Sequence, residues 1–165
     1  MTVLVVGSTR ILGSKIVAAV LDKGTVEVKA MVRSSNDSHE EKRQKIDEMK
    51  AKGAAIVEGD LIKPETLLLA CAEVDVIVSA VGNNEVTVLG QKNLIDAAKQ
   101  QGVKRFIPSD YWVDYRQLSL GRQRQPGYAA GGVGASSLWL LQSSLGFHTQ
   151  AMNTKSPTSL RSWGF

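Results

Sequence analysis

The segment with the clearest chemical potential is a turn between two glycines near the start of the chain. Val3–Val6 is an apolar run, Gly7 ends it, and Gly13 lies at the start of a helical pattern. Backbone N–H groups at a helix start lack partners within the helix, and the helix dipole favours an anion there. A strand that turns at Gly7 and enters a helix near Gly13 therefore predicts a site for the diphosphate of a dinucleotide. The alternative is an ordinary strand–helix turn.

A cation follows the next strand pattern. Val26–Val32 alternates in polarity, and Arg33 and Ser34 come directly after it. Proteins that bind NAD usually place an acidic residue here for the ribose 2′-hydroxyl, whereas a guanidinium suits a 2′-phosphate. The sequence therefore favours NADP(H). The alternative is a solvated arginine, and the nearby Lys42 and Arg43 either assist it or form a solvated helix face.

Two further loops follow predicted strands. Gly59–Leu61 comes after the third strand, where an adenine ring would lie in such a site. Ser79–Gly82 comes after the fourth, beside the expected diphosphate and nicotinamide ribose, and its small residues would allow a ligand to approach closely. Tight loops without a ligand are the alternative.

The elements that would position these loops alternate between two periods. Apolar runs predict strands, and residues recurring at intervals of three and four predict helices between them. Gly24 ends the first helix, Ser38 and Glu41 form a capping box for the second, and Pro64 suits the first turn of the third. The strands are expected at residues 3–6, 26–32, 54–57, 74–78 and 105–107. This alternation predicts an α/β fold, a doubly wound parallel sheet of order 3-2-1-4-5.

Composition limits the alternatives. The 165 residues, 43% of them hydrophobic, suit one globular domain. Cys71 is the single cysteine, and His39 and His148 lie far apart, so we expect neither a disulfide framework nor a metal site. No apolar run reaches membrane-spanning length, and no basic segment precedes Val3, so we expect no membrane span, no secretory signal and a cytoplasmic location.

The charge distribution separates the end of the chain from the rest. Residues 1–117 hold equal numbers of basic and acidic residues, whereas residues 118–165 hold four basic residues and no acidic one. Four scattered charges do not form a nucleic-acid-binding stripe. The periodicity also fades from Leu118, and seven of the 15 glycines lie beyond it. We therefore expect a domain over residues 1–117 and a weakly structured, divergent tail over residues 118–165.

Taken together, these segments resemble the NmrA-like and isoflavone-reductase-like group of atypical short-chain dehydrogenases. The resemblance covers residues 2–117 in order and spacing, through the segments VLVVGSTRILG, KAMVRSS, VEGDL, VIVSAVG and GVKRFIPSDYWVDY. It implies a Rossmann fold that binds NADPH. Members of the group reduce small phenolic, quinone or carbonyl substrates, or bind the dinucleotide as redox-sensing regulators without turnover.

The resemblance also assigns candidate cofactor-binding residues. The turn that would hold the diphosphate contains Gly7, Ser8, Thr9, Arg10, Ile11, Leu12 and Gly13. The other positions are Arg33 and Ser34 at the 2′-phosphate, Asp60 and Leu61 beside adenine, Ala80 and Val81 on the nicotinamide side, and Ser109 on the loop that lines the active site.

The chain departs from the family pattern in three places. Arg10 replaces the usual middle glycine, as in related GGTRFLG-type loops, and would be strained if that position required a positive φ. Trp112 stands where the family has glycine. After Leu120 the expected helix with a catalytic lysine is missing: Lys155 has no helical pattern around it, and no Tyr-x-x-x-Lys pair occurs.

A shifted reading frame is one hypothesis for the tail. One back-translation of residues 121–128, read one base later, encodes Gly-Asp-Asn-Ala-Asn-Pro-Gly, close to the usual family continuation. The sequence thus leaves three functions open: an NADPH-dependent reductase, a dinucleotide-sensing regulator, and an inactive truncated fragment. A sheet without its later strands would also expose an edge, which favours homo-oligomerisation or aggregation.

Overall fold

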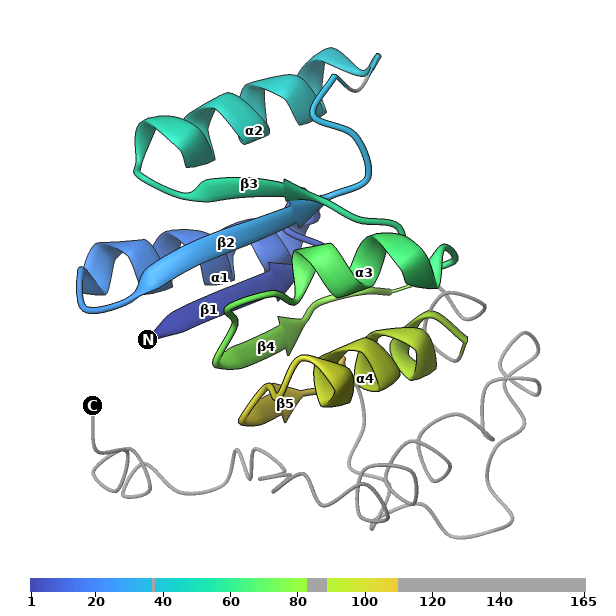
Figure 1. Cartoon of the computed structure of the whole chain (residues 1–165). Helices are drawn as coiled ribbons and strands as arrows, with labels where there is room; N and C mark the ends of the chain where they lie inside the picture. The colour runs from blue at the N-terminus through green and yellow to red at the C-terminus, as the bar shows by residue number, and fades with distance from the viewer. Residues whose placement is uncertain (37, 83–88, 110–165) are drawn as a thin grey trace, which may run out of the picture.

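The computed structural model describes residues 1–36, 38–82 and 89–109 (Figure 1). Nine elements alternate along this part of the chain: β1 (Thr2–Val6), α1 (Ile11–Lys23), β2 (Glu27–Val32), α2 (Glu40–Ala51), β3 (Ala55–Glu58), α3 (Pro64–Ala70), β4 (Val76–Ser79), α4 (Gln91–Gln100) and β5 (Arg105–Ile107). The domain boundary expected at residue 117, Trp112, Lys155 and the tail over residues 118–165 lie outside the described residues.

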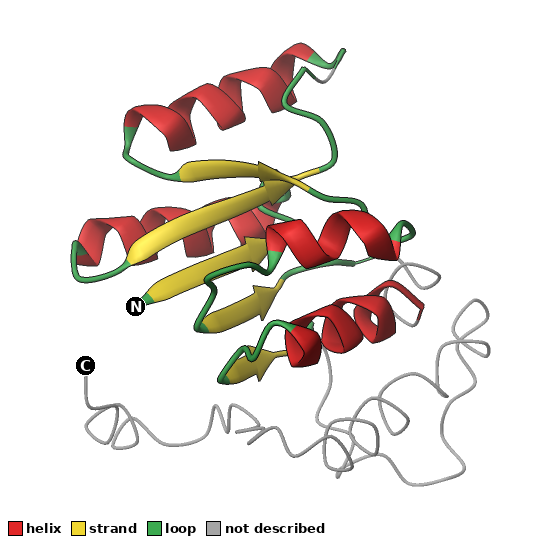
Figure 2. Cartoon of the chain, in the orientation of Figure 1, coloured by secondary structure: helices red, strands yellow, loops and turns green. Residues whose placement is uncertain are grey.

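The five strands form one parallel sheet in the order β3-β2-β1-β4-β5, which confirms the predicted topology. The strand arrows in Figure 2 accordingly point the same way. Reversal of the strand order beside β1 creates the switch point at which doubly wound sheets bind ligands. Because all carboxyl ends lie at one edge, the loops after the strands meet there.

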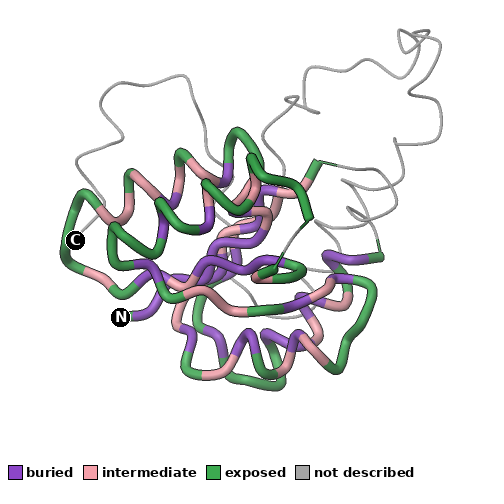
Figure 3. Tube along the Cα trace, turned by 90° about the horizontal axis from the view of Figure 1, so that it is seen from above, coloured by how far each residue is buried: buried purple, intermediate pink, exposed green. Residues whose placement is uncertain are grey.

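Helices cover both faces of the sheet, and successive residues of β1 pack against opposite faces. Leu4 and Val6 belong to an apolar cluster with residues of α3 and α4, whereas Val3 and Val5 belong to a cluster with residues of α1 and α2. Every residue of β1 is buried, as expected for a central parallel strand. The buried positions in Figure 3 accordingly gather along the middle of the sheet.

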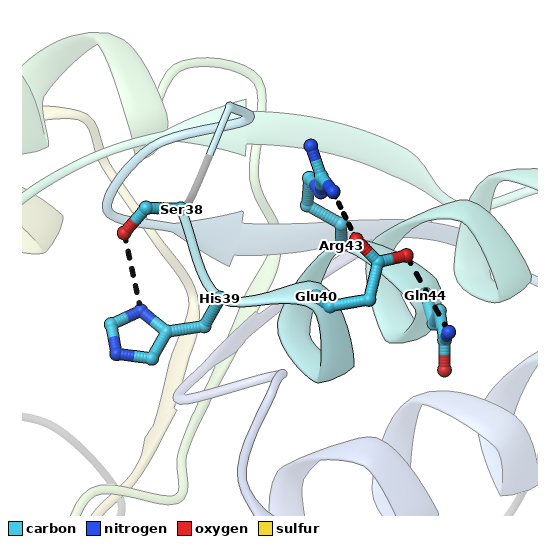
Figure 4. A network of polar contacts seen from close by, with 5 residues as sticks. All are labelled: Ser38, His39, Glu40, Arg43 and Gln44. Carbon is cyan, nitrogen blue, oxygen red and sulfur yellow. Dashed lines mark hydrogen bonds and ion pairs between the residues drawn. The ribbon is translucent and has the colours of Figure 1, made fainter.

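Two helix ends test the predicted caps. Gly24 ends α1 in the left-handed conformation, with φ of 64°, and its N–H donates to the carbonyl of Leu21, as predicted. The capping box predicted for α2 is wrong: His39 is the N-cap residue and forms no side-chain cap. Because the helix begins at Glu40, Ser38 lies one residue too early, and its hydroxyl instead lies 3.5 Å from Nδ1 of His39 (Figure 4).

Candidate functional site

The candidate site lies at the carboxyl edge of the sheet, around the switch point between β1 and β4. Five segments follow the carboxyl ends of the five strands: residues 7–13, 33–36, 59–61, 80–82 and 108–109. All the cofactor-binding residues predicted from the sequence belong to these segments. The fold therefore brings them to one edge of the sheet.

The turn after β1 is closed by backbone contacts that only glycine permits. Gly7 has φ of +81°, and a Cβ there would lie 2.6 Å from the carbonyl oxygen of Ala80. A Cβ on Gly13 would lie 2.1 Å from the carbonyl oxygen of Gly7. The N–H of Arg10 donates to that same oxygen at 3.0 Å. The two glycines thus let the start of α1 pack directly on the end of β1.

The N-terminus of α1 carries no cap and no acidic residue. Arg10 is the N-cap, forms no side-chain cap, and the first turn contains neither Asp nor Glu. The first N–H groups of a helix have no partner within it, and the helix dipole adds partial positive charge. Arg10 has φ of −83° in extended backbone, so the strain that a positive φ would impose on an arginine does not arise. This helix start is therefore suited to an anion.

Exposed side chains surround that helix start. Ile11 is 77% exposed and Leu12 is 42% exposed, so apolar surface is available beside the anion site. Nη1 of Arg10 lies 3.6 Å from the point where a Cβ on Gly82 would stand. The guanidinium thus reaches from the β1–α1 turn to the loop after β4, and it places a cation at the switch point.

A lysine that the sequence analysis missed also reaches this turn. Nζ of Lys45, on α2, donates to the carbonyl oxygen of Thr9 at 3.4 Å, and the side chain is half-buried. Arg43, which the sequence suggested as a helper, forms an ion pair with Glu40 on the exposed face of α2 (Figure 4). The position of Lys45 four residues before the buried Met49 was the available sequence signal, because residues four apart lie on the same side of a helix and Met49 faces the core.

The loop after β2 presents Arg33 to solvent. Within the described part of the chain, no carboxylate pairs with this guanidinium. Ser34 is exposed, and its hydroxyl accepts the N–H of Asn36 at 3.2 Å. Arg33 is therefore available for an anionic ligand, at the strand end where a dinucleotide places its adenosine ribose.

A carboxylate lies beside that loop. Oε1 of Glu58, the last residue of β3, accepts the N–H of Ser35 at 2.7 Å and the hydroxyl of Ser35 at 2.6 Å. These two hydrogen bonds stabilise the ionised form and hold the pKa of Glu58 below its usual value. Glu58 is thus a negative charge at the edge of the candidate site.

The loop after β3 is held by local hydrogen bonds. Asp60 accepts the N–H of Ile62 through Oδ1 at 3.0 Å, while its own N–H donates to the hydroxyl of Thr66 at 2.9 Å. Leu61 is buried in the apolar cluster, and its carbonyl accepts the amide of Asn93 at 2.9 Å. Asp60 therefore offers a partly exposed carboxylate at this edge, whereas the Leu61 side chain lies in the core.

Ser109 connects the end of β5 to the switch point. Its hydroxyl donates to the carbonyl of Val81, and its N–H donates to Oε1 of the buried Gln91 at 2.9 Å. The N–H of Ala80 in turn donates to the carbonyl of Val6 at 2.8 Å. These bonds fix Ala80, Val81 and Ser109 relative to the β1 turn.

Two serines at the ends of the adjacent strands β1 and β4 are fully buried, and they differ in their hydrogen-bond partners. Ser8 lies two residues after β1, and Ser79 is the last residue of β4. The hydroxyl of Ser8 donates to the carbonyl of Met31 at 2.8 Å, whereas that of Ser79 has no hydrogen-bond partner among the described residues. We expect Ser8→Ala to lower the free energy of unfolding by about 1 kcal/mol, because it removes a buried hydrogen bond. Ser79→Ala should leave it within about 0.5 kcal/mol of the wild type or raise it. Urea denaturation measures both, and equal losses would contradict this difference.

The described residues provide groups that can bind a ligand, but neither a reactive thiol nor a cluster of metal-ligating side chains. Cys71 is fully buried, and burial raises the pKa of its thiol to about 11, so it is not a nucleophile at neutral pH. Within residues 1–36, 38–82 and 89–109, no cluster of three metal-ligating side chains occurs. In the same ranges, no helix has the length and apolar character needed to cross a membrane. The arrangement is suited to holding a large anionic ligand across the switch point.

Comparison with known proteins agrees with this geometry. The model of the NmrA-like family matches residues 1–129. An isoflavone reductase homolog from Nicotiana tabacum is 35% identical over 113 residues, which are 68% of this chain and 36% of that protein. A phenylcoumaran benzylic ether reductase from Pinus taeda is 36% identical over 113 residues, with the same two coverages. The chain thus spans little more than a third of the length of these relatives.

Solved structures show the same architecture. AtPrR2 with NADP+ and (+)pinoresinol is 31% identical with a TM-score of 0.74, and the match covers 88% of this chain and 47% of that one. The binary complex of leucoanthocyanidin reductase and NADPH from Vitis vinifera is 26% identical with a TM-score of 0.76, covering 89% of this chain and 47% of that one.

Proposed function

The chain belongs to the NmrA-like family, and on this basis we propose that it binds NADP(H) as the nucleotide-binding portion of a reductase of small phenolic, quinone or carbonyl substrates. The observation that carries the proposal is the uncapped N-terminus of α1, which has no acidic residue in its first turn and opens at the switch point of the sheet. Two of the similar structures are complexes with this dinucleotide.

The residues of the edge fit the parts of NADP(H). Backbone N–H groups at the start of α1, together with the guanidinium of Arg10, would hold the diphosphate. Arg33 would bind the 2′-phosphate, and Lys45 would add a second cation from α2. The remaining candidates follow β3, β4 and β5: Asp60 and the backbone of Leu61 would border adenine, and Ala80, Val81 and Ser109 would border the nicotinamide side.

The bound dinucleotide would supply a hydride for reduction of a carbonyl or benzylic carbon. The contribution of the described residues to this chemistry is positional. The hydrogen bonds from Ser109 to Val81 and Gln91 hold the strand ends on the nicotinamide side, so the cofactor would meet a preformed surface. We assign no general acid among residues 1–109, since the family places its catalytic lysine beyond Leu120.

Isothermal titration of the full chain with NADPH and NADH tests the proposal. We expect both to bind, with a micromolar dissociation constant for NADPH and a weaker one for NADH, because only NADPH has a 2′-phosphate for Arg33 to bind. A sample whose circular dichroism shows a folded α/β protein, yet which gives no binding heat with either dinucleotide, would overturn the proposal. NADPH binding without consumption in the presence of quinones or phenolic carbonyls would instead support the sensing function.

A further inference from the structure

The carboxylate of Glu58 lies at the position where this site would recognise the adenosine ribose. In the parallel pairing of β2 and β3, Glu58 is opposite Val32, the last residue of β2. Neighbouring strands are about 4.8 Å apart. Glu58 therefore stands beside the strand end that leads directly into Arg33, Ser34 and Ser35, and an anionic group bound by Arg33 would lie close to it.

The contacts of Glu58 oppose a 2′-phosphate in two ways. Its Oε1 accepts both the N–H and the hydroxyl of Ser35, the two donors of that residue that could otherwise reach a phosphate. Its negative charge is exposed and, within the described residues, is not neutralised by a cation within ion-pair distance. An uncompensated carboxylate repels a phosphate that carries one to two negative charges.

The same carboxylate suits the other dinucleotide. Sites selective for NAD use an acidic side chain near the end of the second strand to accept the ribose 2′-hydroxyl. In this chain β2 is followed by a cation, Arg33, whereas the acid comes from the neighbouring strand. A cation that favours NADPH and a carboxylate that favours NADH thus lie at the neighbouring ends of β2 and β3.

We propose that Glu58 is a specificity-determining residue that narrows the preference of this site for NADPH over NADH, by holding the donors of Ser35 and by placing a carboxylate beside the 2′-phosphate position. This inference rests on the proposed function. Arg33 attracts the 2′-phosphate, and Glu58 offsets part of that attraction. The chain is then expected to bind both dinucleotides, with a smaller difference in affinity than Arg33 alone would produce.

The variant Glu58→Gln isolates the charge, since glutamine keeps an oxygen that can accept from Ser35. At low ionic strength we expect it to tighten NADPH binding by about three- to tenfold, while NADH binds equally well or more weakly. The matched control is Glu27→Gln. Glu27 lies at the opposite end of β2, about 16 Å from Val32, and accepts a hydroxyl hydrogen bond from Thr2 at 3.2 Å. This control should leave both affinities unchanged.

Isothermal titration of the full-chain variants with the two dinucleotides, at low and at high salt, provides the readout. The gain for NADPH should shrink at high salt, because screening weakens a charge effect at an exposed site. An unchanged NADPH-to-NADH ratio in Glu58→Gln would overturn the inference, and so would an equal loss for both, which would mean that Glu58 only holds the loop. Failure of the wild type to bind either dinucleotide would overturn the proposed function, and this inference with it.

Discussion

Replacement of Gly13 by alanine is expected to abolish dinucleotide binding and to lower the free energy of unfolding by about 3 kcal/mol. The added Cβ would lie 2.1 Å from the carbonyl oxygen of Gly7 and 2.7 Å from its carbonyl carbon. Both are backbone atoms at the end of the central strand, so no side-chain rotation can relieve the clash. The start of α1 would have to move away from β1, and the N–H groups proposed to bind the diphosphate would move with it.

Urea denaturation followed by circular dichroism measures the loss of stability, and titration with NADPH measures the loss of binding. Gly82→Ala is the matched control. Among the described residues, its Cβ would meet Nη1 of Arg10 alone, at 3.6 Å, an ordinary contact with a flexible side chain. We expect this control to stay within about 0.5 kcal/mol of the wild type. A Gly13→Ala protein as stable as the wild type would refute the close-packing role.

The sequence was sufficient to predict the sheet because the patterns that indicate strands and helices are local and recur along the chain. Each strand is a short segment between turn residues that is either apolar throughout or alternates in polarity, and each helix carries apolar residues at intervals of three and four. The βα alternation is therefore visible without tertiary knowledge. Right-handed crossovers then leave few topologies, and the order 3-2-1-4-5 is among them. The two glycines of the first turn mark a required close approach, which the structure bears out.

The contacts of the loop after β2 and of Lys45 could not be predicted in this way. The hydrogen bonds from Ser35 to Glu58 join residues 23 positions apart, and that from Lys45 to Thr9 joins residues 36 positions apart. Each depends on the register of neighbouring elements and on a side-chain rotamer, which periodicity does not encode. The capping box failed for a related reason, because the pattern allows a helix start at either of two adjacent residues and the structure uses the later one.

Arg10 shows how a backbone angle decides the interpretation of a substitution. In the sequence it replaces a glycine of the family pattern, which would be costly at a positive φ. The structure gives it extended backbone and directs the guanidinium toward Gly82. Arginine is therefore compatible with the turn, and it adds a cation to the backbone N–H groups of the candidate anion site. The sequence alone could not distinguish strain from an added contact.

Under the proposed function, the cations and the carboxylate at the edge would make cofactor preference a balance of opposed charges. Arg33 follows β2, Lys45 approaches from α2, and Glu58 ends β3. Removal of one group should therefore shift the affinity for NADPH with little effect on NADH, provided the group contacts only the 2′-phosphate. The difference between the effects on NADPH and on NADH affinity should be largest for Arg33, because its guanidinium has no competing carboxylate partner among the described residues.

Arg33→Ala is accordingly expected to weaken NADPH binding by about 10- to 150-fold, which corresponds to roughly 1.5–3 kcal/mol for a hydrogen bond to a charged group. NADH has no 2′-phosphate, so its affinity should change by less than about threefold. Isothermal titration of the wild type and the variant with both dinucleotides measures this difference. The free energy of unfolding should remain within about 0.5 kcal/mol of the wild type, since Arg33 is exposed.

Arg43→Ala is the matched control for the loss of an arginine. Arg43 is exposed on α2 and forms an ion pair with Glu40, so its removal should change neither the NADPH-to-NADH ratio nor, beyond a few tenths of a kcal/mol, the stability. A loss in Arg33→Ala that is equal for the two dinucleotides would remove the 2′-phosphate assignment. A loss selective for NADPH in Arg43→Ala, without one in Arg33→Ala, would mean that the 2′-phosphate is bound from α2, with Arg33 in solvent.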